Sequence, residues 1–217
     1  MTALIDADIV AYRCAASAEE EPYEIALLRV DKLMMDILEK EINHISFLSG
    51  ENNFRYNINP QYKANRKDKP KPRWLDTCRG YLVDEYKAIV VDGYEADDAL
   101  GIHQTEETVI YTIDKDLLMI PGHHFNFVKK EYKEVSELDG FKAFYRQMLI
   151  GDSSDNIFGV PKIGKVKAAK LIDSCTSESE MRNLVFDLYS DPIRFLMNAD
   201  CLWIMRKEGQ RYSDRKL

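Results

Sequence analysis

The sequence predicts an α/β fold in which helices cover both faces of a mostly parallel central sheet, with a more helical region at the C-terminal end. Short apolar segments alternate with longer amphipathic ones, which is the pattern of repeated strand–helix units. Carboxylates follow several of the apolar segments directly, and ligands of such sheets bind beyond the carboxyl ends of the strands. We expect this core over residues 1–150 and a helical region over 151–217, together forming one compact unit.

The expected strands are short apolar runs that end at polar or glycine residues. They are Ala3–Ile5, His44–Leu48, Ala88–Val91, Thr108–Ile113 and His124–Val128. The expected helices follow them with apolar residues at helical spacing or with acids in the first turn. They cover residues 9–18, 23–42, 74–86, from 95 onward, 138–150, from 165 onward, 181–189 and 192–205.

Composition sets broad limits on location and partners. The formal net charge of −7 argues at first against a nucleic-acid partner, but a carboxylate cluster is effectively neutralised when it holds divalent cations. Four scattered cysteines without a C-x-x-C pair are typical of reduced thiols in a cytoplasm. No apolar run approaches the roughly 18 residues that cross a bilayer. We therefore expect a soluble cytoplasmic monomer that does not bind membranes.

Four acidic motifs lie at boundaries of the expected elements. They are Asp6-Ala-Asp8, Glu95-Ala-Asp97-Asp98, Asp114-Lys-Asp116 and Asp152-Ser-Ser-Asp155. A lone aspartate at a strand end usually caps a helix or lies in a solvated turn. Several such groups brought to one edge of the sheet would repel one another unless cations were bound. Because the motifs contain oxygen ligands and neither His nor Cys, they predict two Mg²⁺ or Mn²⁺ ions rather than zinc.

The acidic residues are expected to differ in role. Those nearest the central strand ends are the best ligands of a first ion, namely Asp6, Glu95, Asp97 and Asp114. A second ion would be held by Asp116, Asp152 and Asp155. Asp98 is expected to support a ligand, because adjacent helix residues point in different directions. Asp8 shares a face of the extended strand with Asp6 or caps the following helix, and both alternatives stay open.

A basic segment follows the second expected strand. From Tyr62 to Arg73 it carries six cations against one acid, which are Lys63, Arg66, Lys67, Lys69, Lys71 and Arg73. Charge alone favours a solvated loop, and two prolines prevent a continuous helix. The alternative is a guide for a single nucleic-acid strand, with Tyr62 as a stacking surface and Lys67 among the phosphate contacts. Lys63 or Arg66 could then stabilise charge developing on a phosphate.

A glycine-bounded turn precedes the lysine-rich helix expected from residue 165. The turn, Gly159-Val160-Pro-Lys-Ile163-Gly164, resembles a helix–hairpin–helix. Glycines let the backbone approach phosphates, and a helix N-terminus supplies N–H donors with partial positive charge. With Lys165 and Lys167 following, the motif predicts sequence-independent binding of nucleic acid.

Together these motifs resemble the 5′-nuclease family, which includes flap endonucleases, 5′-3′ exonucleases and the N-terminal domain of DNA polymerase I. The resemblance rests on Ile5-Asp6, Tyr62-Lys-x-x-Arg66, Tyr94-Glu-Ala-Asp-Asp98, Thr112-x-Asp-Lys-Asp-Leu117 and Gly151-Asp-Ser-Ser-Asp-Asn-Ile-x-Gly-Val-Pro-x-Ile-Gly164, in family order. With no polymerase portion, the chain looks most like a stand-alone bacteriophage exonuclease. A phage enzyme would work in the host cytoplasm.

The resemblance implies a sheet with carboxylates over its rim, an arch segment at about residues 60–80 for the 5′ strand, and a helix–three-turn–helix that grips duplex DNA. It also implies that Lys63 and Arg66 assist phosphodiester cleavage. By the same resemblance, backbone carbonyls around Ser153, Val160 and Ile163 would bind a potassium ion. The implied substrate is DNA with 5′ single-stranded ends or flaps beside a duplex.

This chain departs from the family pattern at the end of the second expected strand. Many members place an aspartate there, whereas this sequence has Ser49-Gly50-Glu51. The first metal site could lose a ligand, or Asp8 or Glu51 could replace it. The arch segment is also short and interrupted by prolines, which favours a loose loop.

The main hypothesis is a two-metal, structure-selective DNA 5′-nuclease. Asp6, Asp97, Asp114 and Asp155, with Lys63 and Arg66, form its expected catalytic set. A non-catalytic DNA-binding relative with an impaired metal site is one alternative, and an RNA-directed nuclease of related fold is another.

Overall fold

The computed structural model describes residues 1–38 and 43–215, and the chain divides into two compact units. Unit 1 comprises Met1–Asn53, Pro70–Lys115 and Gly122–Glu134; unit 2 comprises Phe54–Lys69, Asp116–Pro121 and Val135–Leu217. This division differs from the expected boundary at residue 150. Helix α6 (Glu137–Ile150) buries its apolar face with the C-terminal helices, and so it belongs to unit 2.

The sheet lies in unit 1 and confirms the predicted fold class. Its strands run in the order β3-β2-β1-β4-β5-β6, and β1 pairs in parallel with both β2 and β4. The strand bounds are Thr2–Asp6 (β1), His44–Ser49 (β2), Ile89–Val91 (β3), Thr108–Tyr111 (β4), Gly122–Asn126 (β5) and Glu131–Val135 (β6). The pairs β2–β3 and β4–β5 are also parallel, so the carboxyl ends of these five strands share one edge.

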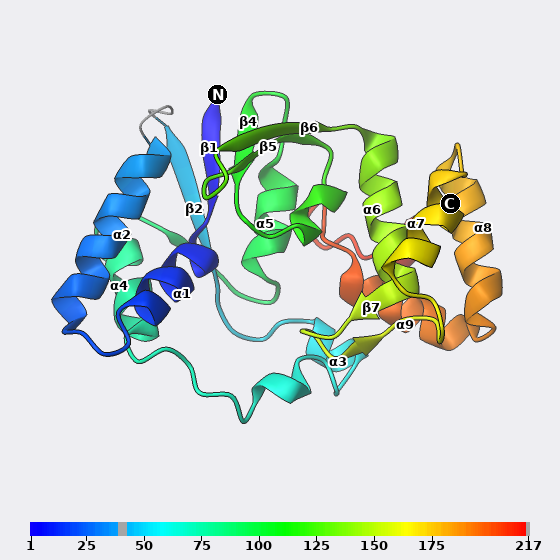
Figure 1. The fold of residues 1–217 in the computed structure, drawn as a ribbon, viewed down its shortest axis with the longest axis horizontal. Helices are drawn as coiled ribbons and strands as arrows, with labels where there is room; N and C mark the ends of the chain where they lie inside the picture. The colour runs from blue at the N-terminus through cyan, green and yellow to red at the C-terminus, as the bar shows by residue number, and fades with distance from the viewer. Residues whose placement is uncertain (39–42, 216–217) are drawn as a thin grey trace. The chain divides into compact units, whose positions relative to one another are not determined.

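Helices cover both faces of this sheet (Figure 1). On one face α1 (Ala7–Ser17), α2 (Tyr23–Leu38) and α4 (Leu75–Asp84) pack together over a core that includes Ala3 and Ile5. On the other face lies α5 (Ala96–His103), where the rings of Phe47 and His103 are 4.8 Å apart. Leu4 is also fully buried, so the central strand reads as a continuous apolar run.

Two expectations about unit 1 were wrong in detail. Strand β4 ends at Tyr111 rather than Ile113, because the side chain of Thr112 accepts a hydrogen bond from the N–H of Asp114 and turns the chain. Strand β6 was not expected, because four of its five residues are exposed and it lacks an apolar alternation. The expected end of the second helix, residues 39–42, lies outside the described residues.

Unit 2 is mainly helical, as expected beyond residue 165. Around α6 it contains α7 (Lys165–Asp173), α8 (Glu178–Tyr189) and α9 (Pro192–Leu202), with shorter segments α3 (Arg55–Ile58), η1 (Ala64–Arg66), η2 (Asp116–Met119) and η3 (Tyr212–Asp214). Ser136, Ser177 and Asp191 cap α6, α8 and α9 through side-chain oxygens. Helix α9 ends three residues before the expected Met205, because Trp203 adopts an extended conformation.

A small antiparallel hairpin in unit 2 was not expected. Strands β7 (Gly151–Asp152) and β8 (Ile157–Phe158) pair, and residues 153–156 form the turn between them. The arch segment has no long helix: η1 is followed by turns until α4 begins at Leu75. Among the described helices, none has the length and apolar character needed to cross a lipid bilayer.

Candidate functional site

In unit 1 the carboxyl ends of β1 and β4 bring two of the predicted ligands together. Asp6 ends β1 and caps α1, its Oδ1 accepting from the N–H of Ile9 at 3.1 Å. The hydroxyl of Thr112 donates to Oδ2 of Asp6 at 2.8 Å and accepts from the N–H of Asp114 at 3.0 Å. Thr112 therefore links the two carboxylate residues across the neighbouring strands.

Asp6 lies in an environment that disfavours its charge. It is 2% exposed. Burial, with the nearby charges of Asp8 and Asp114, raises the pKa of Asp6 from 3.8 to about 7, although hydrogen bonds from Ile9 and Thr112 favour the ionised form. A bound cation would relieve this electrostatic cost.

Asp8 neither shares a face of the extended strand with Asp6 nor caps the following helix. It lies inside the first turn of α1, because β1 already ends at Asp6 and Asp6 is the cap. Its Oδ2 accepts from the N–H of Ser49 at 2.9 Å, and its Oδ1 forms an ion pair with Arg79 of α4. The same guanidinium donates to the carbonyl of Ser49. Asp8, Ser49 and Arg79 thus contact one another, and these contacts hold the Asp8 side chain in place.

Ser49 stands where the family pattern often has an aspartate, and it orients the next acidic motif. Its hydroxyl accepts a hydrogen bond from the N–H of Ala96 at 2.9 Å, at the start of α5. Glu95 and the fully buried Asp98 form a capping box there. Asp97 lies in the same first turn and is half-buried.

Glu51 is exposed and belongs to another turn. Its N–H donates to Oδ1 of Asp92 at 2.8 Å, and its carbonyl accepts from Gly93. Within residues 1–38 and 43–215, no three His, Cys, Asp or Glu side chains already form a group that could hold a metal ion.

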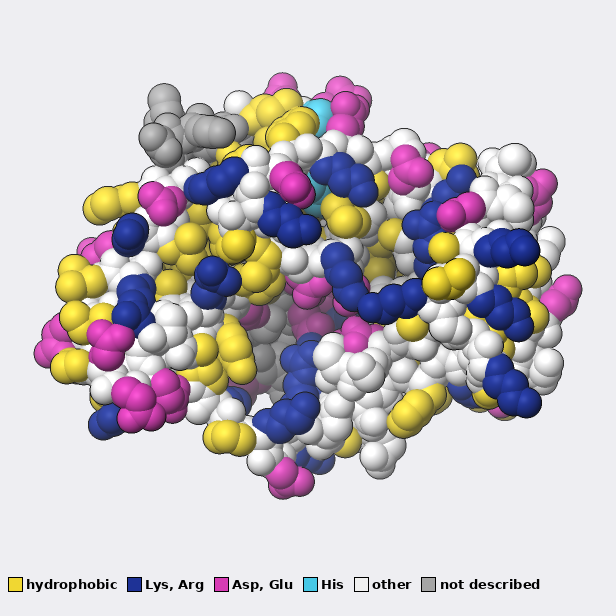
Figure 2. Space-filling model, in the orientation of Figure 1, with side chains coloured by type: hydrophobic (Ala, Val, Ile, Leu, Met, Phe, Trp, Pro, Cys, Tyr) yellow, Lys and Arg dark blue, Asp and Glu magenta, His cyan; other side chains and the backbone are white. Residues whose placement is uncertain are grey.

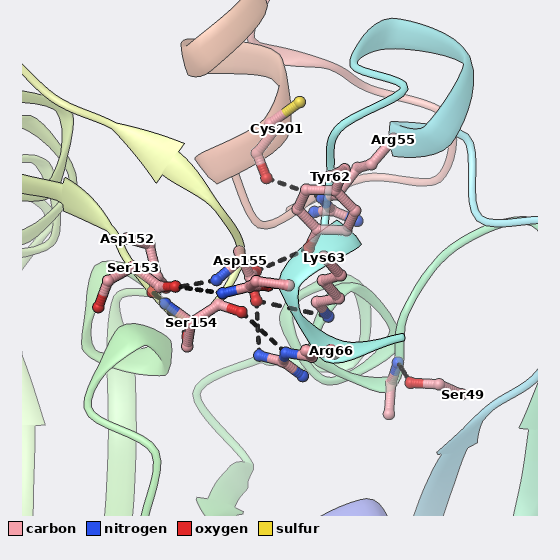
Figure 3. Close-up of polar contacts among 12 residues, drawn as sticks. Ser49, Arg55, Tyr62, Lys63, Arg66, Asp152, Ser153, Ser154, Asp155 and Cys201 are labelled. Atoms are coloured by element: carbon pink, nitrogen blue, oxygen red, sulfur yellow. Dashed lines mark hydrogen bonds and ion pairs between the residues drawn. The ribbon is translucent and has the colours of Figure 1, made fainter. Parts of the chain in front are cut away.

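In unit 2 the side chain of Asp155 is surrounded by donors (Figure 3). The hydroxyl of Tyr62 donates to Oδ2 at 2.8 Å, and Nη2 of Arg66 lies 2.6 Å from Oδ1. Nζ of Lys63 lies 3.8 Å from the same oxygen. The two cations expected to act on a phosphate thus contact a carboxylate expected to bind metal.

The backbone around this cluster is joined by further hydrogen bonds. The N–H of Lys63 donates to the carbonyl of Asp155 at 2.9 Å, and Asn65 donates to the carbonyl of Ser153 at 2.7 Å. Asn156, in the left-handed region, donates to the carbonyl of Gln61 at 2.8 Å. The segment carrying Lys63 is therefore fixed to the β7–β8 turn.

The expected stacking role of Tyr62 was wrong. Its side chain is 1% exposed, because the phenol packs inside unit 2 to reach Asp155. The other predicted acids of unit 2 have local contacts: Oδ1 of Asp152 accepts from the N–H and hydroxyl of Ser154 at 2.7 and 2.6 Å, and Asp116 begins η2. Of the basic segment, Arg66 and Lys67 are exposed and Lys63 is half-buried.

The predicted turn lies directly before α7. Gly159 and Val160 are half-buried, Ile163 is buried, and Gly164, Lys165 and Lys167 are exposed. Gly164 caps the helix without a side-chain acceptor, and the first turn of α7 has no acid. Lysines near a helix N-terminus add to its positive potential, which favours an anion there. Figure 2 shows several Lys and Arg side chains over the part of the viewed face that α7 and α8 form in Figure 1.

Two of the three carbonyls expected to bind potassium, those of Ser153 and Val160, accept hydrogen bonds within the protein. The carbonyl of Ser153 accepts from Asn65, and the carbonyl of Val160 accepts from the N–H of Ile163 at 3.2 Å. At the base of the turn, the guanidinium of Arg194 donates to the carbonyls of Phe158 and Gly159. The carbonyls of Phe158 and Gly159 thus accept hydrogen bonds from a positively charged side chain.

Sequence reasoning gave no role to several residues that organise these groups. Thr112 begins the Thr112–Leu117 motif, and its position directly after an apolar strand was the one sequence feature that could have pointed to its contact with Asp6. Arg79, Arg194 and Asn198 lie within helices far along the chain from their partners, so no local pattern pointed to them.

Comparison with known proteins places these features in a family. Residues 1–146 match the family model described as the 5′-3′ exonuclease, N-terminal resolvase-like domain. A 5′-3′ exonuclease of Buchnera aphidicola subsp. Schizaphis graminum (strain Sg) is 30% identical over 205 residues, covering 84% of this chain and 71% of that protein. DNA polymerase I of Bacillus caldotenax is 26% identical over 209 residues, but only 23% of its length is covered, against 78% of this chain.

Solved structures show the same fold. Bacteriophage T5 5′-exonuclease with bound zinc has a TM-score of 0.68 at 17% identity, covering 93% of this chain and 89% of that one. A pseudo-enzyme–product complex of bacteriophage T5 flap endonuclease with DNA and metal ions has a TM-score of 0.65 at 16% identity, with the same coverage. From the match to the family model and the similarity to the Buchnera protein, we conclude that this chain belongs to the 5′-3′ exonuclease family.

Proposed function

We propose that this protein is a divalent-metal-dependent DNA 5′-nuclease that hydrolyses phosphodiester bonds near single-strand/duplex junctions, as a 5′-3′ exonuclease and flap endonuclease. The observation that carries the proposal is the linkage of Asp6, Thr112 and Asp114 at the carboxyl ends of β1 and β4, with the charge of Asp8 nearby. This group of carboxylates, of which Asp6 is buried and Asp8 and Asp114 are half-buried, would attract a cation. We also propose that it acts as a cytoplasmic monomer.

The donor set of unit 1 fits Mg²⁺ or Mn²⁺, because all of its candidate ligands are hard carboxylate oxygens. Asp6, Glu95, Asp97 and Asp114 would hold one ion. Asp116, Asp152 and Asp155 are proposed for a second. When bound, such ions activate a water and stabilise the leaving oxygen of a phosphodiester.

The chain's own residues would do the remaining work. Thr112 keeps Asp6 and Asp114 in register, and Ser49 holds the N-terminus of α5, where Glu95 and Asp97 begin the helix. Lys63 and Arg66 would exchange Asp155 for the substrate phosphate and stabilise its developing charge. The hairpin at Gly159–Gly164 and the lysines of α7 would bind the duplex backbone without reading its sequence.

The direct test is cleavage of a duplex with a labelled 5′ flap in Mg²⁺ and in Mn²⁺. Wild-type protein should release the flap and then shorten the 5′ strand, whereas Asp114→Asn should lose at least a hundredfold in rate. Asp187→Asn removes an exposed carboxylate of α8 and serves as the matched control, with an unchanged rate expected. Absence of cleavage by the wild type in both metals would overturn the proposal.

A non-catalytic DNA-binding protein is the second candidate function. Two observations favour it: Ser49 replaces a common family aspartate, and Asp8 is paired with Arg79. A calorimetric Mn²⁺ titration separates the candidates. A nuclease should bind two ions, while an impaired site should bind at most one ion weakly and still retain duplex affinity.

A further inference from the structure

The turn of the Gly159–Gly164 hairpin is held at its base by two side chains of α9. Nη2 of Arg194 donates to the carbonyl of Phe158 at 2.9 Å and also to the carbonyl of Gly159. The amide of Asn198 donates to the same Phe158 carbonyl at 2.9 Å. Two consecutive carbonyls therefore point toward a fixed positive charge supplied by the protein.

The surroundings make this arrangement rigid. Asn198 is 2% exposed and contacts the hydroxyl of Tyr189, which donates to the carbonyl of Met148 at 2.7 Å. A Cβ at Gly159 would collide with the backbone at Leu149 and Ile150. The N–H of Val160 donates to the carbonyl of Leu149 at 2.8 Å. The hairpin base is thus joined to both α6 and α9.

We propose that the guanidinium of Arg194 replaces a monovalent cation at the base of this hairpin, so that the hairpin keeps its conformation without potassium. A carbonyl oxygen has a second lone pair, but an ion approaching Phe158 or Gly159 would meet a positive charge already in contact. The carbonyls of Ser153 and Val160 also have donors. Arg194 is a positioning residue, since it contacts the hairpin backbone and, under the proposed function, would act on DNA only through it.

Ion replacement on the wild-type protein is the first test. Amide hydrogen exchange of the peptide covering Phe158–Lys165 is measured by mass spectrometry in potassium chloride and in tetramethylammonium chloride at equal concentration, without DNA. The exchange rates should agree within about twofold. Hairpin protection that depends on potassium would overturn the proposal, and this arm requires no variant.

Variants then test Arg194 itself. In tetramethylammonium chloride, Arg194→Met should exchange in the hairpin roughly tenfold faster or more, because charged hydrogen bonds to the backbone are lost. Arg194→Lys, which keeps a cationic donor, should recover most of the protection. Lys207→Met removes an exposed cation of unit 2 and should behave as wild type. Wild-type exchange rates in Arg194→Met would contradict the proposed role.

A third arm extends the test to DNA and rests on the proposed function. Fluorescence anisotropy should give the same duplex affinity for the wild type in the two salts. A loss of affinity when potassium is replaced would overturn the proposal. If no duplex binds in either salt, the proposed function fails, while the exchange measurements still decide the role of Arg194.

Discussion

Replacing Asp6 by Asn should stabilise the metal-free protein at alkaline pH. The amide is close in size to the carboxyl group, and its Oδ1 can still accept from the N–H of Ile9, whereas its Nδ2 cannot accept from the hydroxyl of Thr112 and would donate to it instead. It removes the charge that burial and the nearby Asp8 and Asp114 disfavour. The same substitution should abolish cleavage, so stability and activity would change in opposite directions.

The magnitude follows from the pKa of Asp6. Folding raises it from 3.8 to about 7, and a shift of about 3 units corresponds to about 4 kcal/mol at 1.36 kcal/mol per unit. Because the pKa is raised in the folded state, the neutral carboxyl favours folding fully below pH 3.8, and this contribution is lost as the pH rises to about 7. Asn stays neutral throughout. The variant should therefore exceed the wild type by up to about 4 kcal/mol at pH 8 and approach it near pH 4.

Urea denaturation in EDTA, followed by circular dichroism between pH 4 and pH 8, measures this difference. Asp187→Asn is the control, because it removes an exposed carboxylate with the same chemistry. Its stability should follow the wild type at every pH. The reasoning is refuted if Asp6→Asn is less stable than the wild type at pH 8, or if the difference between them does not change with pH.

Three further experiments test other contacts. Asp155→Asn should bind single-stranded DNA about fivefold more tightly in EDTA, because the lysine and arginine that contact it become available to phosphates; unchanged anisotropy would contradict this. A double-mutant cycle of Arg79→Met with Asp8→Asn should give a coupling of about 1 kcal/mol in urea denaturation, and zero coupling would show that the ion pair contributes nothing. Gly159→Ala should lower the free energy of unfolding by about 1–3 kcal/mol, because its Cβ meets backbone, whereas Gly164→Ala has open space and should cost far less. Equal losses for the two glycine variants would refute the steric argument.

The sequence was sufficient for the elements whose signals are local. The apolar run before Asp6 predicted a buried central strand, and the alternation of strands and helices predicted the parallel sheet. The acidic first turn after Glu95 predicted a helix start, and the structure adds a capping box there. Such features depend on residues a few positions apart, which a sequence displays directly.

Contacts between distant segments were not predictable in the same way. The basic neighbours of Tyr62 suggested exposure, yet its partner Asp155 lies 93 residues along the chain and draws the phenol into the interior. The pairing of Asp8 with Arg79 spans 71 residues and depends on how α4 packs on α1. The Thr112–Asp6 link depends on the register of β1 and β4. Each is decided by tertiary structure.

The most direct test of the account is a calorimetric Mn²⁺ titration of metal-free protein at pH 8. The central claim is that carboxylates at the ends of β1 and β4 form a divalent-cation site. We predict that the wild type and Asp187→Asn bind Mn²⁺ alike, while Asp6→Asn and Asp114→Asn each lose at least tenfold in affinity for one ion. Wild-type affinity in both of these variants would contradict the claim.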